Sequence, residues 1–317
     1  MFEAKVIAHS ISDSNKEIIT YQLKYPRFIH SEFLTHRLFS RNASSSRAIP
    51  VAKMIEQVRT NPAMPIHWGA NQPGMQADEE LDEWNKGLVI GAWQSASDHA
   101  ARLAEDMDKW GAHKQVVNRI LEPFQWISVV VTATEWDNFH ALRSHKDAQP
   151  EIKLLSDMML KARAKSTPQL LKAGEWHLPY IDLKKDFDEV SLLLENVRSE
   201  ENWYEQIYEI LKKVSAARCA RVSYLTHDGK PTTVEADLAL CERLAGAQPF
   251  HASPFEHQAT PDNLKYLPYI DSTAHPDGNA IGFQRRWENP ELHGNFVGWI
   301  QARKLMDGEH ITEYQYT

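Results

Sequence analysis

Cysteine is scarce in this chain of 317 residues: only Cys219 and Cys241 are present, which excludes a disulfide framework and a four-thiolate metal site. No apolar run approaches the roughly 20 residues of a membrane span, so we expect no contact with a membrane. The first residues lack the basic flank and apolar run of a signal peptide. Together these absences predict a reducing, cytoplasmic location.

Positive charge is also in short supply. The 35 Lys and Arg against 43 Asp and Glu give a formal net charge of −8, whereas proteins that bind nucleic-acid polymers usually present a basic face. We therefore expect no nucleic-acid polymer as a partner. The chain also lacks Gly-x-Gly-x-x-Gly, a P-loop and Cys-x-x-Cys, so Rossmann-type dinucleotide recognition and P-loop chemistry have no support. A small anionic ligand stays open, because local arginine clusters bind phosphate on acidic proteins.

What is present is enough apolar material for a core, with hydrophobic residues at 42%. β-branched and aromatic residues predict strands at 5–11, 17–25 and 125–134. Apolar residues at three- and four-residue spacing predict a helix from about residue 78 to residue 110, and another over 149–165. The expected fold class is α+β, a mixed sheet with a helix-rich layer.

The second half of the chain is less regular. Its charged stretch 182–201 is typical of a connector, and "ARVSYLTHDGKPT" (220–232) predicts a strand and turn. Residues 271–282 predict a loop, and "GNFVGWIQARKLM" (294–306) predicts a closing helix.

The stretch "FLTHRLFSRNASSSRAIP", from Phe33 to Pro50, concentrates hydrogen-bond donors behind an apolar helix end. Serine hydroxyls, backbone N–H groups and guanidinium forks together make a phosphate cradle. The alternative is a solvated loop with a helix cap, because serines commonly cap helices and form turns.

Three further segments carry candidate residues. In "HASPFEH" (251–257) the six-residue gap between the histidines is wrong for a helical zinc pair, so we expect a polar pocket and no metal. In "NFHALR", Asn138 and Arg143 project from neighbouring turns of a helix, and a surface ion pair is the alternative for the arginine. Arg119 in "NRILEP" does not by itself indicate a function. A buried, inert role fits Cys241 better than nucleophilic catalysis.

Taken together, these segments resemble the flavin-dependent thymidylate synthase (ThyX) family. "THRLFSRNASSSRA" is similar to its signature RHRxxSxNExSxRY, and "ARVSY", "HASPFEH", "NFHALR" and "NRILEP" look like four more family blocks. The departures are Thr35, Ala43 and Ala48 within the signature and Glu32, which stands where glutamine is usual. In the family the ARVSF and SPFEH blocks precede the signature, so the blocks are in permuted order here. A circular permutation or an internal duplication would explain the order.

The resemblance implies methylation of dUMP to dTMP, with methylenetetrahydrofolate supplying the carbon, FAD the hydride and NADPH the reducing power. It implies Arg143 as the catalytic residue, polarising the uracil. The implied substrate-binding residues are Glu32, Ser44, Ser45, Arg47, Arg119 and Arg143. The implied FAD-binding residues are His36, Arg37, Asn138, His251 and Ser253. It also implies a homotetramer with sites at subunit interfaces.

Two alternatives to thymidylate synthesis stay open. A related enzyme could carry out 5-hydroxymethylation of dUMP or act on a cytosine nucleotide, as the changed signature positions would suit. A non-catalytic flavin- or nucleotide-binding homologue is the other. For domain organisation we expect a signature and catalytic-arginine region at 1–180 with a long helical insertion. An ARVSY/SPFEH region at 181–317 is expected to pack into the same domain.

Overall fold

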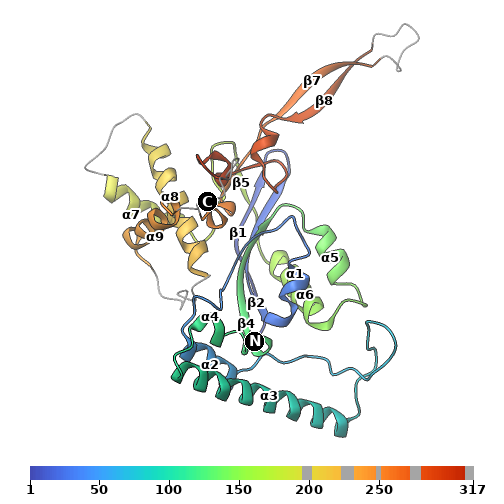
Figure 1. Cartoon of the computed structure of the whole chain (residues 1–317). Helices are drawn as coiled ribbons and strands as arrows, with labels where there is room; N and C mark the ends of the chain where they lie inside the picture. Colours follow the sequence, from blue (N-terminus) through green and yellow to red (C-terminus); the bar gives the residue numbers. More distant parts are fainter. Residues whose placement is uncertain (195–201, 223–231, 248–250, 272–279, 311–317) are drawn as a thin grey trace, which may run out of the picture.

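A mixed five-stranded sheet forms the centre of the computed structural model (Figure 1). The structure describes residues 1–194, 202–222, 232–247, 251–271 and 280–310. The strand order is β3-β4-β2-β1-β5, with every neighbouring pair antiparallel except β1 and β5. The strands are β1 (Glu3–Ser12), β2 (Glu17–Pro26), β3 (Ser40–Ala43), β4 (Trp126–Ala133) and β5 (Gln169–Leu171). The mixed sheet confirms the predicted fold class.

Alternation along β2 and β4 gives the sheet two different faces. On one face, large apolar side chains such as Tyr21, Leu23 and Val131 are fully buried and form the main core. The short helix α1 (His30–Phe33), α5 (Asp137–Arg143) and α6 (Pro150–Ala164) cover this face. The predicted helix at 149–165 is therefore confirmed.

The second face is more polar, and the C-terminal half of the chain covers it. The end of α8 (Trp203–Arg221) packs on it, and α7 (Leu183–Leu194) and α9 (Val234–Ala245) pack against α8. Val130 of β4 packs there against Cys219 and Val222, and the Tyr180 hydroxyl donates to Gln22 Oε1 at 3.0 Å. The connector prediction for 182–201 is wrong over α7, and residues 195–201 lie outside the described residues.

A third group of helices lies beyond one end of the sheet (Figure 1). It consists of α2 (Val51–Thr60), α3 (Glu83–Lys109) and α4 (Lys114–Val117). The predicted long helix is confirmed as α3, whose Asp82 caps the N-terminus by accepting from the Asn85 N–H at 3.0 Å. Its inner face buries Ser97, Ala101 and Ala104. Its outer face leaves Trp84 and Trp110 exposed at 77% and 78%.

The C-terminal segment forms short strands where the sequence pattern indicated other structure. β6 (Ala259–Pro261) pairs with β9 (Trp299–Gln301), and β7 (Leu264–Asp271) pairs with β8 (Ala280–Trp287) in a ribbon that projects from the body (Figure 1). The helix predicted over 294–306 is wrong, because β9 is followed only by one 3₁₀ turn at Ala302–Leu305. The loop predicted at 271–282 is wrong at its two ends, and 272–279 lie outside the described residues.

The strand and turn predicted for "ARVSYLTHDGKPT" are also wrong where they can be checked. Ala220 and Arg221 are the last residues of α8, and residues 223–231 lie outside the described residues. Within the part of the chain that the structure describes, no helix is long and apolar enough to cross a membrane.

Candidate active site

Strand β3 carries the signature residues to both faces of the sheet. Ser40 and Asn42 face the C-terminal segments, while Arg41 and Ala43 face the main core and α1. Arg41 Nη1 donates to the carbonyls of Leu34 and His36, both at 3.2 Å. Because side chains alternate along a strand, neighbours in the signature point to different surroundings.

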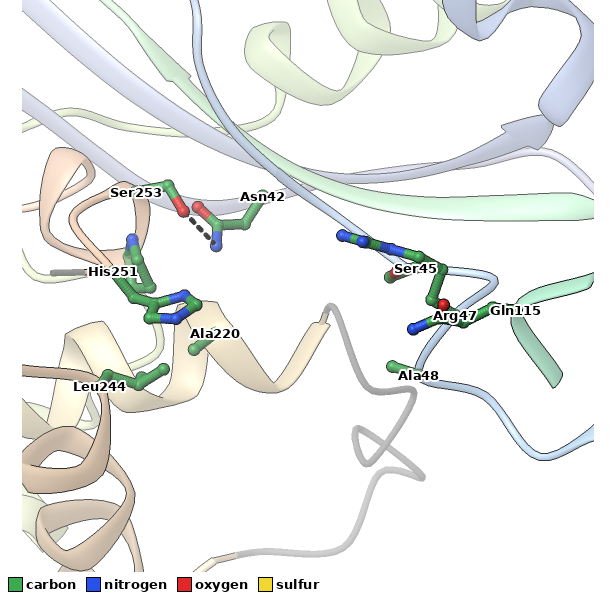
Figure 2. Close-up of a pocket in the computed structure, with 10 residues that line it drawn as sticks. Asn42, Ser45, Arg47, Ala48, Gln115, Ala220, Leu244, His251 and Ser253 are labelled. Carbon is green, nitrogen blue, oxygen red and sulfur yellow. Dashed lines mark hydrogen bonds between the residues drawn. The ribbon is translucent and has the colours of Figure 1, made fainter. Parts of the chain in front are cut away.

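A cavity of about 410 Å³ lies where β3 meets the C-terminal segments (Figure 2). It joins residues that are about 200 positions apart in the sequence, from the signature loop and from "HASPFEH". The lining residues are Asn42, Ser45, Arg47, Ala48, Gln115, Ala220, Leu244, His251, Ser253 and Pro254. Four of the predicted site residues, Ser45, Arg47, His251 and Ser253, are thus brought together.

Arg47 supplies the positive charge of this cavity. Its side chain is exposed, and among the residues that the structure describes no carboxylate pairs with it. The chain enters this position from β3 through a loop held by Asn118, whose Nδ2 donates to the carbonyls of Ser46 and Ile49 at 2.6 and 3.0 Å. A guanidinium held in this way at a cavity wall suits an anionic group.

Ser44 and Arg119 are placed beside the cavity and do not line it. The Ser44 hydroxyl accepts from the Ser128 N–H at 3.1 Å, and the Ser44 N–H donates to the Ser128 carbonyl at 2.8 Å. Arg119 Nη1 donates to Glu122 Oε1 at 2.8 Å, and the same oxygen accepts from the Ser46 hydroxyl at 2.8 Å. Both residues stay predictions as substrate contacts.

Arg143 lies in a second cluster, at the end of α5 against the α1 turn. Its Nε donates to His36 Nε2 at 3.0 Å, and Nη2 donates to Thr35 Oγ1 at 3.2 Å. Nη1 lies 3.5 Å from Glu32 Oε2. No hydrogen bond or ion pair among the described residues joins Arg143 to a residue that lines the cavity. Arg37 and Asn138 are exposed.

The electrostatics of this second cluster follow from partial burial beside two arginines. Burial raises the pKa of Glu32, and Arg143 opposes that shift. Burial, then Arg143 and Arg41, lower the pKa of His36, so its imidazole is neutral at pH 7 and accepts from Arg143. The ring of His36 stacks on Phe39 and meets Phe139 edge-on, which fixes its orientation.

Three polar residues were missed as site residues: Asn42 and Gln115, which line the cavity, and His257, which contacts Asn42. The Asn42 amide lies 3.3 Å from Ser253 Oγ and 3.0 Å from His257 Nε2. Both belong to segments that the sequence singled out, since Asn42 is in the signature and His257 ends "HASPFEH". Gln115, which lines the opposite wall, had no signal in the sequence.

Neither cysteine has the surroundings of a nucleophile. Cys219 is fully buried and Cys241 packs in an apolar cluster with Ala216 and Phe255. Burial raises the pKa of both thiols, to about 11 for Cys241, so both are protonated at pH 7. The described residues contain no group of three metal-ligating side chains.

Residues 15–169 match the model of the family described as thymidylate synthase complementing protein, Thy1, which is the ThyX family. This match covers 155 of the 317 residues, just under half of the chain, and over these residues the chain is similar to the Thy1 family. The matched Thy1 segment holds the signature, Arg119 and Arg143, whereas His251 and Ser253 lie outside it.

Two solved structures of the UMP/dUMP methylase PolB from Streptomyces cacaoi are similar to the chain, each with a TM-score of 0.43. The one bound with 5-Br UMP has 16% identity and covers 52% of this chain and 89% of its own. The one bound with 5-Br dUMP has 15% identity and covers 52% and 90%. No curated protein matches the chain.

Proposed function

We propose that this protein is a Thy1-family enzyme that methylates dUMP to dTMP, with methylenetetrahydrofolate as the carbon donor and NADPH as the reductant of a bound FAD. The observation that carries the proposal is the cavity of about 410 Å³ in which Ser45 and Arg47 of the signature meet His251 and Ser253. This volume is within the range typical of small-molecule sites.

The cavity suits a nucleotide with an anionic phosphate. Arg47 provides a guanidinium fork, and Ser45, Ser253 and His251 add hydroxyl and imidazole groups on the facing walls. Two hydrogen bonds through Glu122 connect Arg119 to Ser46, the residue between the lining residues Ser45 and Arg47. We propose that Arg47 binds the phosphate. We propose that Arg119 also binds the phosphate, after its hydrogen bond to Glu122 is replaced by one to the ligand.

We further propose that the complete site forms between subunits of a homotetramer. The proposed catalytic Arg143 and the proposed FAD contact His36 share a cluster away from the cavity, while His251 and Ser253 line it. The Arg143 cluster of one subunit would then complete the cavity of another. Arg143 would polarise the uracil ring electrostatically. Its guanidinium would either break its ion pair with Glu32 or contact Glu32 and the uracil at the same time.

The outer face of α3 supplies a surface for such an assembly. Trp84, Leu88, Leu103 and Trp110 lie on the side opposite the buried inner face and are 77%, 57%, 42% and 78% exposed. With about 200 Å² for each tryptophan, these four side chains expose roughly 500 Å². A second copy packed on this face would therefore bury about 1,000 Å² in total, the size a specific interface needs.

The arrangement of sizes along α3 favours a second copy in antiparallel orientation. The tryptophans lie near the two ends of the helix, and small residues, Ala92 and Ser95, lie between them on the same side. Antiparallel packing would place each tryptophan against the opposite end of the other helix, with close approach at the small residues in the centre.

The residues present fit a flavin by the chemistry of their side chains. His251 and Ser253 in the cavity, and His36, Arg37 and Asn138 on the α1–α5 side, offer donors for phosphate and for the polar edge of a heteroaromatic ring. FAD would supply hydride transfer when bound. The protein's own part would be to orient the nucleotide and to stabilise negative charge on the uracil.

The test is NADPH oxidation with the flavin identified in the same preparation. We expect the purified protein to be yellow and to oxidise NADPH in the presence of dUMP. A colourless protein that takes up no flavin on reconstitution would contradict the use of FAD. Tight flavin binding without NADPH oxidation would favour the non-catalytic alternative.

The shared site has its own test, by mixing inactive variants. Arg143→Ala and Arg47→Ala are each expected to lose at least about a hundredfold in turnover, because each removes a charged contact to the substrate. When the two are unfolded and refolded together, mixed tetramers should regain a fraction of the wild-type rate. Mixtures no more active than either variant alone would place both arginines in one subunit's site.

A further inference from the structure

Six buried side chains form a continuous hydrogen-bonded chain across the second face of the sheet, here called the buried polar chain. It runs through Ser10, His177, Thr20, Thr132, His257 and Asn42. The successive distances are 2.9, 2.8, 2.7, 2.9 and 3.0 Å. None of the six residues is more than 7% exposed, and the last of them lines the cavity.

The buried polar chain forms because four strands and two loops meet on the second face of the sheet. Thr20 and Thr132 are directly opposite each other in the β2–β4 register, so their hydroxyls meet on the face away from the main core. His177 and His257 come from loops that pack on this face. Each of these hydroxyl, imidazole and amide groups is the hydrogen-bond partner of the next one. A buried polar group without such a partner would destabilise the fold.

Both histidines are neutral in this setting. Burial lowers the pKa of His177 and of His257 to about 3. A neutral imidazole has one N–H donor and one acceptor nitrogen, so it passes on the direction of the hydrogen bond that it receives. The protons of the buried polar chain therefore have two possible arrangements, in which all hydrogen bonds run in one direction or all in the other. Fixing the direction of the hydrogen bond at one end selects between them.

The cavity end makes that selection. The side of the Asn42 amide that faces His257 Nε2 also lies 3.0 Å from the Ser253 carbonyl and 3.2 Å from the Arg41 carbonyl. Carbonyl oxygens only accept, so the amide nitrogen belongs on this side and donates to His257 Nε2. Figure 2 draws the nitrogen toward the Ser253 hydroxyl, and the two carbonyls favour the reverse orientation.

This orientation fixes every other proton in the buried polar chain. His257 carries its proton on Nδ1 and donates to Thr132, whose hydroxyl donates to Thr20. Thr20 then donates to His177 Nε2, and His177 Nδ1 donates to Ser10. The Asn42 carbonyl oxygen is then on the side of the amide that faces the Ser253 hydroxyl, at the cavity wall.

We propose that His257 is a positioning residue that holds the Asn42 carbonyl oxygen toward the cavity, where it accepts an N–H or O–H group of the bound nucleotide. His257 itself lies behind Asn42 and is fully buried, so it acts through the amide. The identity of the nucleotide rests on the proposed function, whereas the proton arrangement rests on the fold alone.

The first test reads the tautomers directly. In the full-length protein with ¹⁵N-labelled histidine, signals of His177 and His257 are assigned with His177→Gln and His257→Gln. We expect Nδ1 protonated and Nε2 unprotonated in both rings, unchanged from pH 5 to pH 8. A ring protonated on Nε2, or one that titrates in this range, would overturn the proton arrangement and the proposal with it.

The second test links the arrangement to binding, with dUMP as the probe. Thr132→Val keeps the side-chain shape and removes the acceptor for His257 Nδ1–H, so His257 would move its proton to Nε2 and turn the Asn42 amide. We expect dUMP affinity to fall about three- to tenfold, as for one lost hydrogen bond, with KM changed more than kcat. The His257 signals should shift as well.

Ser156→Ala is the matched control, because this buried serine bonds to His140 Nδ1 at 2.9 Å on the other side of the sheet. It should leave both dUMP affinity and the His257 signals unchanged. Unchanged affinity in Thr132→Val would overturn the positioning role. Wild-type protein that does not bind dUMP would instead contradict the proposed function and the nucleotide contact, while the ring signals still decide the proton arrangement.

Discussion

At the scale of single residues, Arg47 and Arg143 have opposite surroundings although both lie in family blocks. Arg143 is held by Glu32, Thr35 and His36, and the contact at Thr35 shows that its guanidinium reaches the position where the family signature has its first arginine. Arg47 stands at the cavity wall without a carboxylate partner among the described residues. The charge of Arg47 is thus available to a ligand, whereas that of Arg143 is partly neutralised.

Replacing Arg47 tests this difference. Arg47→Ala should weaken dUMP binding about ten- to a hundredfold, because charge-assisted hydrogen bonds to phosphate are lost. Arg47→Lys should recover only part of the affinity, since an ammonium cannot make the two-pronged contact. Calorimetric titration measures both, with Arg59→Ala, an exposed arginine paired to Glu105, as the control. Equal affinity in Arg47→Ala and wild type would remove Arg47 from the site.

At the scale of elements, the sequence predicted those whose pattern is local. The run "WISVVV" predicts β4 because β-branched residues fit a buried strand, and the three- and four-residue spacing predicts α3 and α6. The closing helix was wrong because "GNFVGWIQ" contains Gly298, which adopts φ +78° and lies against the Trp287 ring. A Cβ at Gly298 would approach that ring to 2.7 Å, a contact no local pattern reveals.

Helix α7 shows a second limit of local patterns. Its charged residues are typical of a connector, yet Asp186 is only 2% exposed. Arg218 of α8 donates to both Asp186 oxygens at 2.7 and 2.8 Å and to Asp237 of α9 at 2.8 Å. The partner lies 32 positions away, so burial of the charge depends on the tertiary fold. The same is true of the cavity, whose walls come from distant segments.

Arg218→Met should therefore destabilise the fold strongly. It leaves the buried carboxylate of Asp186 without its arginine and removes one of the two arginines from Asp237. Breaking a buried ion pair in this way costs about 3–5 kcal/mol of unfolding free energy. Urea unfolding measures the change, with the exposed Lys109→Met as a control expected within about 0.5 kcal/mol. A loss below about 1 kcal/mol for Arg218→Met would show that the three helices do not depend on this arginine.

At the scale of the whole molecule, the buried neutral histidines make stability depend on pH. His177 and His257 have pKa values lowered to about 3 by burial, so between pH 6.5 and pH 3 the unfolded chain binds more protons than the folded one. Their contribution is complete above pH 6.5 and is lost as the pH falls. From pH 7 to pH 5.5 we expect a loss of about 1 kcal/mol per histidine.

Urea unfolding at the two pH values measures this dependence. Wild type should lose about 1 kcal/mol more than His257→Gln between pH 7 and pH 5.5, because the variant lacks one of the titrating groups. The same pH slope in both proteins would contradict a neutral, buried His257.

The outer face of α3 bears on assembly. Trp84→Glu together with Trp110→Glu should shift the protein to smaller assemblies in analytical ultracentrifugation, because two charges would be placed at a desolvated contact. If sites are shared between subunits, the loss of the larger assembly should also lower the enzymatic activity. Leu192→Glu, on the exposed side of α7 at 67%, is the control expected to leave the assembly intact. An unchanged sedimentation coefficient in the double variant would exclude this face as an interface.

The central claim is that the cavity formed by the Thy1 segment and "HASPFEH" converts dUMP to dTMP. The most direct measurement is mass analysis of the nucleotide after incubation with dUMP, methylenetetrahydrofolate and NADPH, with the bound flavin identified in the same sample. We predict a nucleotide heavier than dUMP by one CH₂ group, together with FAD. A product heavier by CH₂O, or dUMP recovered unchanged while FAD is bound, would contradict thymidylate synthesis.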